Sequence, residues 1–226
     1  MKVVILAAGI GSRLGDPNLP KPLTQLANGL SILEFQLKNL SKNISREDVM
    51  IIVGFHKEEI MTRFPDLTFV QNPRFAEENT GKSLLRALEN LNEDVLWING
   101  DVVFHPSIPG RLMSLGKSCM LVNQGLVGEE EVKYRTDGSG KILEVSKQVS
   151  NPEGEALGLN FFKAQDLPLF IQGLRACSDR DYFEYGIEEA IKRGLAVWTV
   201  PVPSHFCTEI DFPEDLKKAN QLIFNW

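Results

Sequence analysis

Residues 2–23 read KVVILAAGIGSRLGDPNLPKPL, and this stretch decides how the chain begins to fold. Its opening apolar run, Lys2 to Leu6, predicts a buried strand. Small residues and a Gly-x-Gly pair follow directly, so a ligand can come close to the backbone and successive N–H groups can form an anion nest. Arg13 then offers a fork for phosphate oxygens, and Lys21, held between two prolines, offers a point charge. The stretch therefore predicts a phosphate-binding loop after a first strand.

Three other interpretations of the glycines in this chain explain less. A dinucleotide fingerprint needs a third glycine and a helix, but Leu14 stands at that position and the prolines that follow cannot continue a helix. Gly81-Lys82-Ser83 resembles the end of a Walker A loop, but Ala76 stands where the first glycine belongs. A plain turn accounts for the glycines of the first loop and leaves Arg13 and Lys21 beside it unexplained.

The first half of the chain alternates between strand and helix patterns. Ser31 and Glu34 have the spacing of a capping box before an apolar helix face. Helices are predicted at 31–40, 56–64 and 80–91, and strands at 49–53, 67–70 and 95–98. Because strands separated by helices require right-handed crossovers, the first half predicts a mainly parallel sheet.

The second half contains more strands, and two of them flank a strong hairpin turn at Asp137-Gly138-Ser139-Gly140. Strands are predicted at 119–123, 131–136, 141–146, 156–162 and 196–200, and helices at 165–176, 182–193 and 213–224. No Pro/Gly/Ser-rich linker separates the two halves. We therefore predict one α/β domain over residues 1–226, in which a phosphate-binding half at about 1–115 carries a mixed-sheet part at about 116–226.

Composition excludes several classes of protein. The 226 residues contain 24 Lys+Arg against 30 Asp+Glu, a formal charge of −6, so we expect neither a nucleic-acid nor an anionic-membrane partner. No apolar run approaches the ~18 residues of a membrane span, and no signal-peptide cleavage site follows the first one. The three cysteines are odd in number and widely spaced, which favours a reducing, cytoplasmic location.

Two aspartates stand where a metal-nucleotide site would need them. Asp101 follows the strand at 95–98 and so lies at a carboxyl end of the sheet, where open α/β folds bind ligands. Asp211 precedes the last helix, and in an extended segment Glu209 and Asp211 point to the same face. Mg²⁺ is usually held by one or two carboxylates and the phosphates themselves. Taken alone, Asp101 could be a turn residue and Asp211 a helix cap; beside the glycine loop, both favour metal.

These motifs, taken in order, resemble those of the nucleotidyltransferases that activate sugar phosphates and related phosphates. The loop matches LxxGxGxRL…PKPL, while Asn-Gly-Asp at 99–101 and Glu-Ile-Asp-x-Pro-Glu-Asp at 209–215 resemble the two metal-binding motifs. The resemblance implies a Rossmann-like, three-layer α/β/α fold with a mainly parallel mixed sheet. It also implies Mg²⁺ on Asp101 and Asp211, catalytic roles for Arg13 and Lys21, and a nucleotide-binding loop formed by Leu6, Ala7, Ala8, Gly9, Gly11 and Ser12.

The segment at 69–84 looks most like that of the phosphocholine cytidylyltransferase group. This resemblance implies CTP as the nucleotide and base or ribose contacts from Asn72, Asn79 and Ser83. The alternative for these three side chains is ordinary turn and helix-cap chemistry.

The candidate acceptor-binding residues lie in the second half of the chain. Lys147 is similar in placement to a lysine that binds the acceptor phosphate in this family, although an exposed lysine at a strand end is the simpler interpretation. Glu184 lies among aromatic residues at 181–185, and carboxylates beside aromatics could hold a cationic head group. The acidic run at 129–131 does not match the aromatic, choline-contacting stretch of the phosphocholine enzymes, so choline itself is not implied.

The resulting hypothesis is a nucleotidyltransferase that moves a nucleoside monophosphate, CMP from CTP, to a small phosphorylated or phosphonylated acceptor and releases pyrophosphate. Residues 1–115 would bind the nucleotide and residues 116–226 the acceptor. Two alternatives stay open: a sugar-1-phosphate nucleotidyltransferase that uses UTP or dTTP, and a catalytically silent nucleotide-binding regulator. The presence of Arg13, Lys21, Asp101 and Asp211 opposes the silent regulator, because such a protein would be expected to lose one of them.

Overall fold

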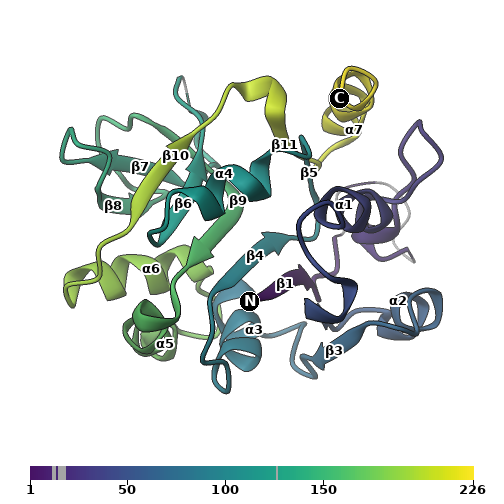
Figure 1. Cartoon of the computed structure of the whole chain (residues 1–226), viewed down its shortest axis with the longest axis horizontal. Helices are drawn as coiled ribbons and strands as arrows, with labels where there is room; N and C mark the ends of the chain where they lie inside the picture. The colour runs from purple at the N-terminus through teal and green to yellow at the C-terminus, as the bar shows by residue number, and fades with distance from the viewer. Residues whose placement is uncertain (12–13, 15–18, 126) are drawn as a thin grey trace.

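A mixed sheet passes through the middle of the protein (Figure 1). The structure is a computed structural model that describes residues 1–11, 14, 19–125 and 127–226. Strand β1 (Lys2–Ala7) lies inside this sheet, with β2 (Val49–Val53) and β4 (Val95–Asn99) parallel to it on either side. Strand β3 (Thr68–Gln71) extends the sheet beyond β2, again in parallel. Residues 3–6 of β1 are buried on both faces, which explains why this strand is an unbroken apolar run.

The second half of the chain continues the same sheet. Strand β9 (Gly154–Phe162) pairs antiparallel with β4 on one side and with β6 (Cys119–Val122) on the other, and β10 (Trp198–Pro201) pairs parallel with β6. The predicted hairpin is formed by β7 (Lys133–Thr136) and β8 (Ile142–Ser146), and β7 also pairs with β9. The order β10-β6-β9-β4-β1-β2-β3 confirms the prediction of a mainly parallel mixed sheet.

Helices cover both faces of the sheet and complete the predicted three layers. Side chains on one face pack against α1 (Ile32–Leu40), α2 (Lys57–Arg63) and α4 (Ile108–Ser114). Those on the other face pack against α3 (Thr80–Leu88), α5 (Leu167–Ala176) and α6 (Phe183–Lys192). Helix α7 (Pro213–Ile223) lies against the outer side of α1 through a small third cluster that includes Phe35 and Ile210 (Figure 1).

Several short elements lie outside the predicted pattern. Two three-residue strands, β5 (Val102–Phe104) and β11 (Cys207–Glu209), pair antiparallel with each other beside the main sheet. Helix α4 was likewise not predicted, and single 3₁₀ turns occupy Lys21–Leu23, Arg46–Asp48, Ala164–Asp166 and Ser204–Phe206. Three residues are too few to display a period of two, so sequence periodicity does not reveal such strands. Among the described helices, none combines the length and apolarity that crossing a bilayer requires.

Candidate active site

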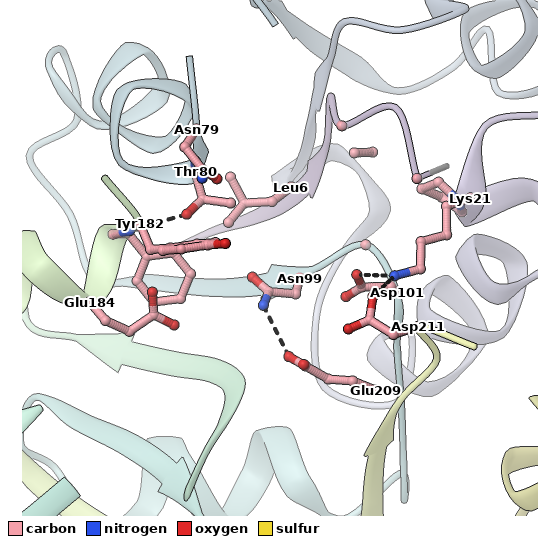
Figure 2. A pocket seen from close by; sticks show the side chains of 16 residues that line it. Leu6, Lys21, Asn79, Thr80, Asn99, Asp101, Tyr182, Glu184, Glu209 and Asp211 are labelled. Carbon is pink, nitrogen blue, oxygen red and sulfur yellow. Dashed lines mark hydrogen bonds and ion pairs between the residues drawn. The ribbon is translucent and has the colours of Figure 1, made fainter. Parts of the chain in front are cut away.

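A pocket of about 360 Å³ opens at the carboxyl ends of β1 and β4 (Figure 2). Its wall combines segments that are far apart in the sequence, and the predicted loop contributes Leu6, Ala7, Gly9 and Gly11. The remaining wall comes from residues 21–22, 79–80, 99–101 and 182–184 and from Glu209 and Asp211. This is the position at which open α/β sheets bind ligands.

Lys21, Asp101 and Asp211 meet on one side of this pocket (Figure 2). The Lys21 Nζ lies 2.7 Å from Asp101 Oδ2 and 2.6 Å from Asp211 Oδ1, and the lysine side chain is only 10% exposed. Burial by itself would lower the pKa of the Lys21 ammonium, but the two carboxylates outweigh it and raise that pKa above its ordinary value. Three residues from three distant motifs therefore form one ion-paired cluster.

Local backbone contacts fix both aspartates. The Gly100 N–H donates to the Leu6 carbonyl at 2.9 Å, and a Cβ on Gly100 would lie 2.5 Å from that same oxygen, so only glycine fits in the turn before Asp101. The Ile210 N–H donates to the Asp101 carbonyl at 3.0 Å, which ties the Asp101 turn to the segment that carries Asp211.

Phe212 occupies the N-cap position of α7, and the side chain that bonds the backbone there is Asp215, not Asp211. The Asp215 carboxylate accepts hydrogen bonds from the backbone N–H groups of Asp211 at 3.1 Å and Phe212 at 2.9 Å. An acidic side chain in this first turn also suits the positive end of the helix dipole. The carboxylate of Asp211 accepts a hydrogen bond from Lys21.

The donor set fits a Mg²⁺ ion bound together with substrate phosphates. Asp101 Oδ2 and Asp211 Oδ1 converge on one cation-sized position, now taken by the Lys21 ammonium. Asp101 Oδ1 is buried and accepts no hydrogen bond from any residue that the structure describes. The described part of the chain contains no group of three or more His, Cys, Asp or Glu side chains able to hold a metal alone. Two carboxylates completed by phosphate oxygens are the usual arrangement for Mg²⁺ in nucleotide sites.

Glu209 and Asn99 form the floor of the pocket between its two sides (Figure 2). The Asn99 Nδ2 donates to Glu209 Oε1 at 3.2 Å. Gly158 lies beneath this pair with φ at +67°, and a Cβ there would be 2.7 Å from the Asn99 amide. Burial raises the pKa of the Glu209 carboxyl to about 8, and the nearby Asp101 carboxylate adds to the rise. The alternation that pairs Glu209 with Asp211 on one face was visible in the sequence, whereas the role of Asn99 was not.

Tyr182 and Glu184 form the wall opposite Lys21 (Figure 2). Glu184 is 7% exposed, and its Oε2 has no hydrogen-bond partner among the described residues. Burial raises the pKa of the Glu184 carboxyl to about 7, against the opposing charge of Lys147. Lys147 Nζ lies 5.0 Å from the centre of the Tyr182 ring and 3.4 Å from Glu130 Oε2. The predicted acceptor residues thus lie near one another, with Glu184 lining the pocket and Lys147 on its margin.

The three residues predicted to contact the base or ribose differ in whether they line the pocket, an adjoining recess or neither. Asn79 lines it, and its side chain also holds the loop at 179–181, with Nδ2 donating to the Arg180 carbonyl at 3.2 Å. Ser83 and Ala8 line an adjoining recess of about 70 Å³. Asn72 is 1% exposed and donates to Ser83 Oγ at 3.0 Å, so it supports Ser83 and lines neither cavity.

Ser12 and Arg13, the other loop residues with a predicted role, lie outside the described residues. The functional roles of all these residues stay predictions.

Comparison with known proteins places the chain in a family. Residues 3–125 match the family described as MobA-like NTP transferase domain, and the chain belongs to that family. It is 28% identical to a CMP-5'-(3-aminopropyl)phosphonate synthase of Streptomyces rubellomurinus, over 97% of this chain and 38% of that protein. It is also 28% identical to a 2-aminoethylphosphonate cytidylyltransferase of Lancefieldella rimae, over 72% of this chain and 67% of the relative.

A solved structure supports the fold. The CTP:phosphocholine cytidylyltransferase LicC of Streptococcus pneumoniae superposes with a TM-score of 0.81 at 21% identity, over 98% of both chains. The chain spans about half or less of the length of the curated relatives that it matches over nearly all of its own residues. The similarity therefore defines the nucleotidyltransferase fold and family, and substrates have to be argued from the pocket.

Proposed function

We propose that this protein transfers CMP from CTP to a small acceptor that carries a phosphate or phosphonate at one end and a cationic amine at the other, with release of pyrophosphate. One observation carries the proposal. The pocket presents Lys21 between Asp101 and Asp211 on one side, and on the other the buried carboxylate of Glu184, whose Oε2 has no hydrogen-bond partner among the described residues.

Each side of the pocket suits one end of such an acceptor. Phosphate oxygens suit the side with Lys21 and a magnesium ion, because opposite charges converge there. An amine suits Glu184, since a buried carboxylate oxygen without a hydrogen-bond partner among the described residues gains most from a cationic donor. Tyr182 beside it offers a ring face to the same cation. Two relatives named for aminoalkylphosphonates agree with this substrate class.

The reaction places few demands on proton transfer. A phosphate or phosphonate oxygen of the acceptor is already anionic near neutral pH, so it can attack the α-phosphorus of CTP without a general base. One P–O bond forms to the acceptor as the bond to the β-phosphate oxygen breaks, and the electron pair leaves with pyrophosphate. The pocket therefore has to supply alignment and charge neutralisation.

Residues of the chain would divide these tasks. Lys21 would contact the oxygens of the reacting phosphates and neutralise charge that develops at the α-phosphorus. Asp101 and Asp211 would hold Mg²⁺, which when bound would orient the phosphates and withdraw charge from them. Lys21 would have to leave its place between the two aspartates as metal and nucleotide enter, because one position cannot hold both cations.

Pyrophosphate release measured for four NTPs against a panel of acceptors tests the proposal. The panel contains 2-aminoethylphosphonate with a primary amine, phosphocholine with a quaternary ammonium, and glucose 1-phosphate and methylphosphonate, neither of which has a cationic group. We expect the highest kcat/KM with CTP and an amine-bearing acceptor. A preference for UTP or dTTP with glucose 1-phosphate would instead identify a sugar-1-phosphate nucleotidyltransferase, and no release from any pair would favour a silent regulator.

A further inference from the structure

A buried amide side chain of helix α1 is hydrogen-bonded to the turn that carries Asp101. Gln36 is fully buried, and its Nε2 donates to the Asn99 carbonyl at 2.8 Å and to the Val102 carbonyl at 2.7 Å. These two carbonyls stand on either side of Gly100 and Asp101 in the chain. We propose that Gln36 is a positioning residue that sets the place of the Asp101 carboxylate, and hence metal affinity, in the site of the proposed function on which this inference rests.

The turn is held from three directions, and Gln36 supplies one of them. On the β1 side, the Gly100 N–H is bonded to the Leu6 carbonyl, and there is no room at Gly100 for even a Cβ. On the β11 side, the Asp101 carbonyl accepts from the Ile210 N–H. On the α1 side, the hydrogen bonds come from Gln36. Loss of the Gln36 amide would leave the two flanking carbonyls without this anchor and let the turn relax away from α1.

Packing alone does not explain an amide at this position. The Oε1 of Gln36 is buried and has no hydrogen-bond partner among the described residues. A buried, unsatisfied oxygen destabilises a fold, and an apolar side chain of similar length would avoid that cost. What a glutamine adds is a pair of donors on one nitrogen, and both are used on the Asp101 turn.

Asn39 offers a matched control on the same helix. It is 5% exposed, and its Nδ2 donates to the Phe104 carbonyl at 2.7 Å. Like the bond from Gln36 to Val102, this is an amide-to-carbonyl hydrogen bond to strand β5. The contact lies at the far end of β5 from Asp101. A purely structural role predicts similar consequences from the loss of either amide, while a positioning role predicts a difference at the metal.

Gln36→Met and Asn39→Leu, two substitutions of similar size, separate the two roles. Mn²⁺ binding is followed by electron paramagnetic resonance in the presence of a non-hydrolysable CTP analogue, and hydrogen exchange is followed at the amides of residues 99–103. For Gln36→Met we expect Mn²⁺ affinity and kcat to fall at least ~10-fold, the scale for residues that orient metal ligands. The KM for CTP should stay within about twofold, and exchange at 99–103 should quicken. Asn39→Leu should lower the Tm without these changes.

Each remaining outcome decides one of the claims. Equal Mn²⁺ affinities and equal exchange at 99–103 in the two variants would overturn the positioning role. If Gln36→Met does not fold, Gln36→Glu replaces it, because a protonated carboxyl can still donate one hydrogen bond and should give a smaller loss of the same kind. A wild-type protein that neither binds Mn²⁺ nor releases pyrophosphate would refute the proposed function, and the exchange rates would still decide whether Gln36 holds the turn.

Discussion

At the scale of single residues, the pocket is an acidic site with one lysine at its centre. Among the described residues that line it, Asp101, Asp211, Glu184 and Glu209 are acidic, and Lys21 is the basic one. The ammonium therefore balances two of the four acids while substrates are absent. Under the proposed function the same charge would become available to phosphates once Lys21 left the aspartates, so one side chain would act in both states.

Replacing Lys21 by methionine should affect turnover and metal binding in opposite directions. We expect kcat to fall at least ~100-fold, the scale for loss of one electrostatic stabiliser of the transition state. Mn²⁺ should bind the nucleotide-free variant more tightly than the wild type, because the two carboxylates lose their internal cation. Steady-state kinetics and Mn²⁺ titration measure the two effects.

Lys163→Met is the control for this substitution, because Lys163 pairs with Asp94 next to the opposite end of β4. It should leave both quantities near wild type. Turnover of Lys21→Met close to that of the wild type would remove Lys21 from the catalytic machinery.

Glu184→Gln should weaken the use of amine-bearing acceptors in a pH-dependent way. With the pKa of Glu184 near 7, its carboxylate is charged at pH 8 and largely protonated at pH 6. The charge of Lys147 opposes the effect of burial on the pKa of Glu184, while the Glu184 carboxylate in turn helps to raise the pKa of the neighbouring Glu209 carboxyl. At pH 8 we expect kcat/KM for 2-aminoethylphosphonate to fall at least ~10-fold, and the ratio of wild type to variant to approach one at pH 6.

The ratio cancels the titration of the acceptor itself, which is common to both proteins. Methylphosphonate should be used equally by the two proteins at every pH. A ratio that does not change with pH, or an equal loss for methylphosphonate, would contradict an amine-binding role.

The same substitution should stabilise the fold at alkaline pH. The pKa of Glu184 is raised from 4.5 to about 7 by burial, so the folded state binds more protons than the unfolded state between these values. Stability from this group is therefore lost as pH rises from 4.5 to 7 and stays lost above it. Glu184→Gln removes that cost, so we expect a higher Tm than wild type at pH 8 and little difference at pH 4.5. An unchanged Tm at pH 8 would show that other groups in the folded protein already offset the cost of burying the charged Glu184 carboxylate.

At the scale of elements, sequence patterns predicted most of the frame and named many of the residues that line the pocket, but not the contacts that align them. Long periodic segments such as α1 and β1 carry their own signal, and the capping box at Ser31 and Glu34 is present as predicted. The short strands β5 and β11 carry none, yet their pairing brings Glu209 opposite Val102 and so places Asp101 beside Asp211. That register depends on long-range partners, which local periodicity does not contain.

The position of the Asp211 backbone depends on the start of α7, and the substitution Asp215→Ala tests this dependence. Loss of the two hydrogen bonds to the backbone of Asp211 and Phe212 should cost about 1 kcal/mol of stability and lower the Tm by roughly 2–4 °C. It should also reduce kcat, since the backbone that aims Asp211 is released. Asp215→Asn keeps an acceptor oxygen and should restore both values. A variant pair with the same kcat as wild type would show that Asp211 is aimed by other contacts.

At the scale of the whole molecule, the two halves of the chain share one sheet and one pocket. Strand β9 from the second half pairs directly with β4 from the first. The pocket takes Lys21 and Asp101 from the first half, and Glu184 and Asp211 from the second. We therefore propose that residues 1–226 unfold as one unit, because separation of the halves would break a central strand pair and divide the site.

Thermal unfolding with and without Mg²⁺ and CTP tests whether the two halves unfold together. We expect one transition, with coincident curves from circular dichroism and tryptophan fluorescence and equal calorimetric and van't Hoff enthalpies. A ligand at 100 times its dissociation constant adds ~2.7 kcal/mol to the folded state, so the whole transition should move up by roughly 5–10 °C. Asp101→Asn should keep the single transition and lose most of the shift. Two transitions, or a shift confined to one of them, would mean that the halves fold separately and that the nucleotide is held by the first alone.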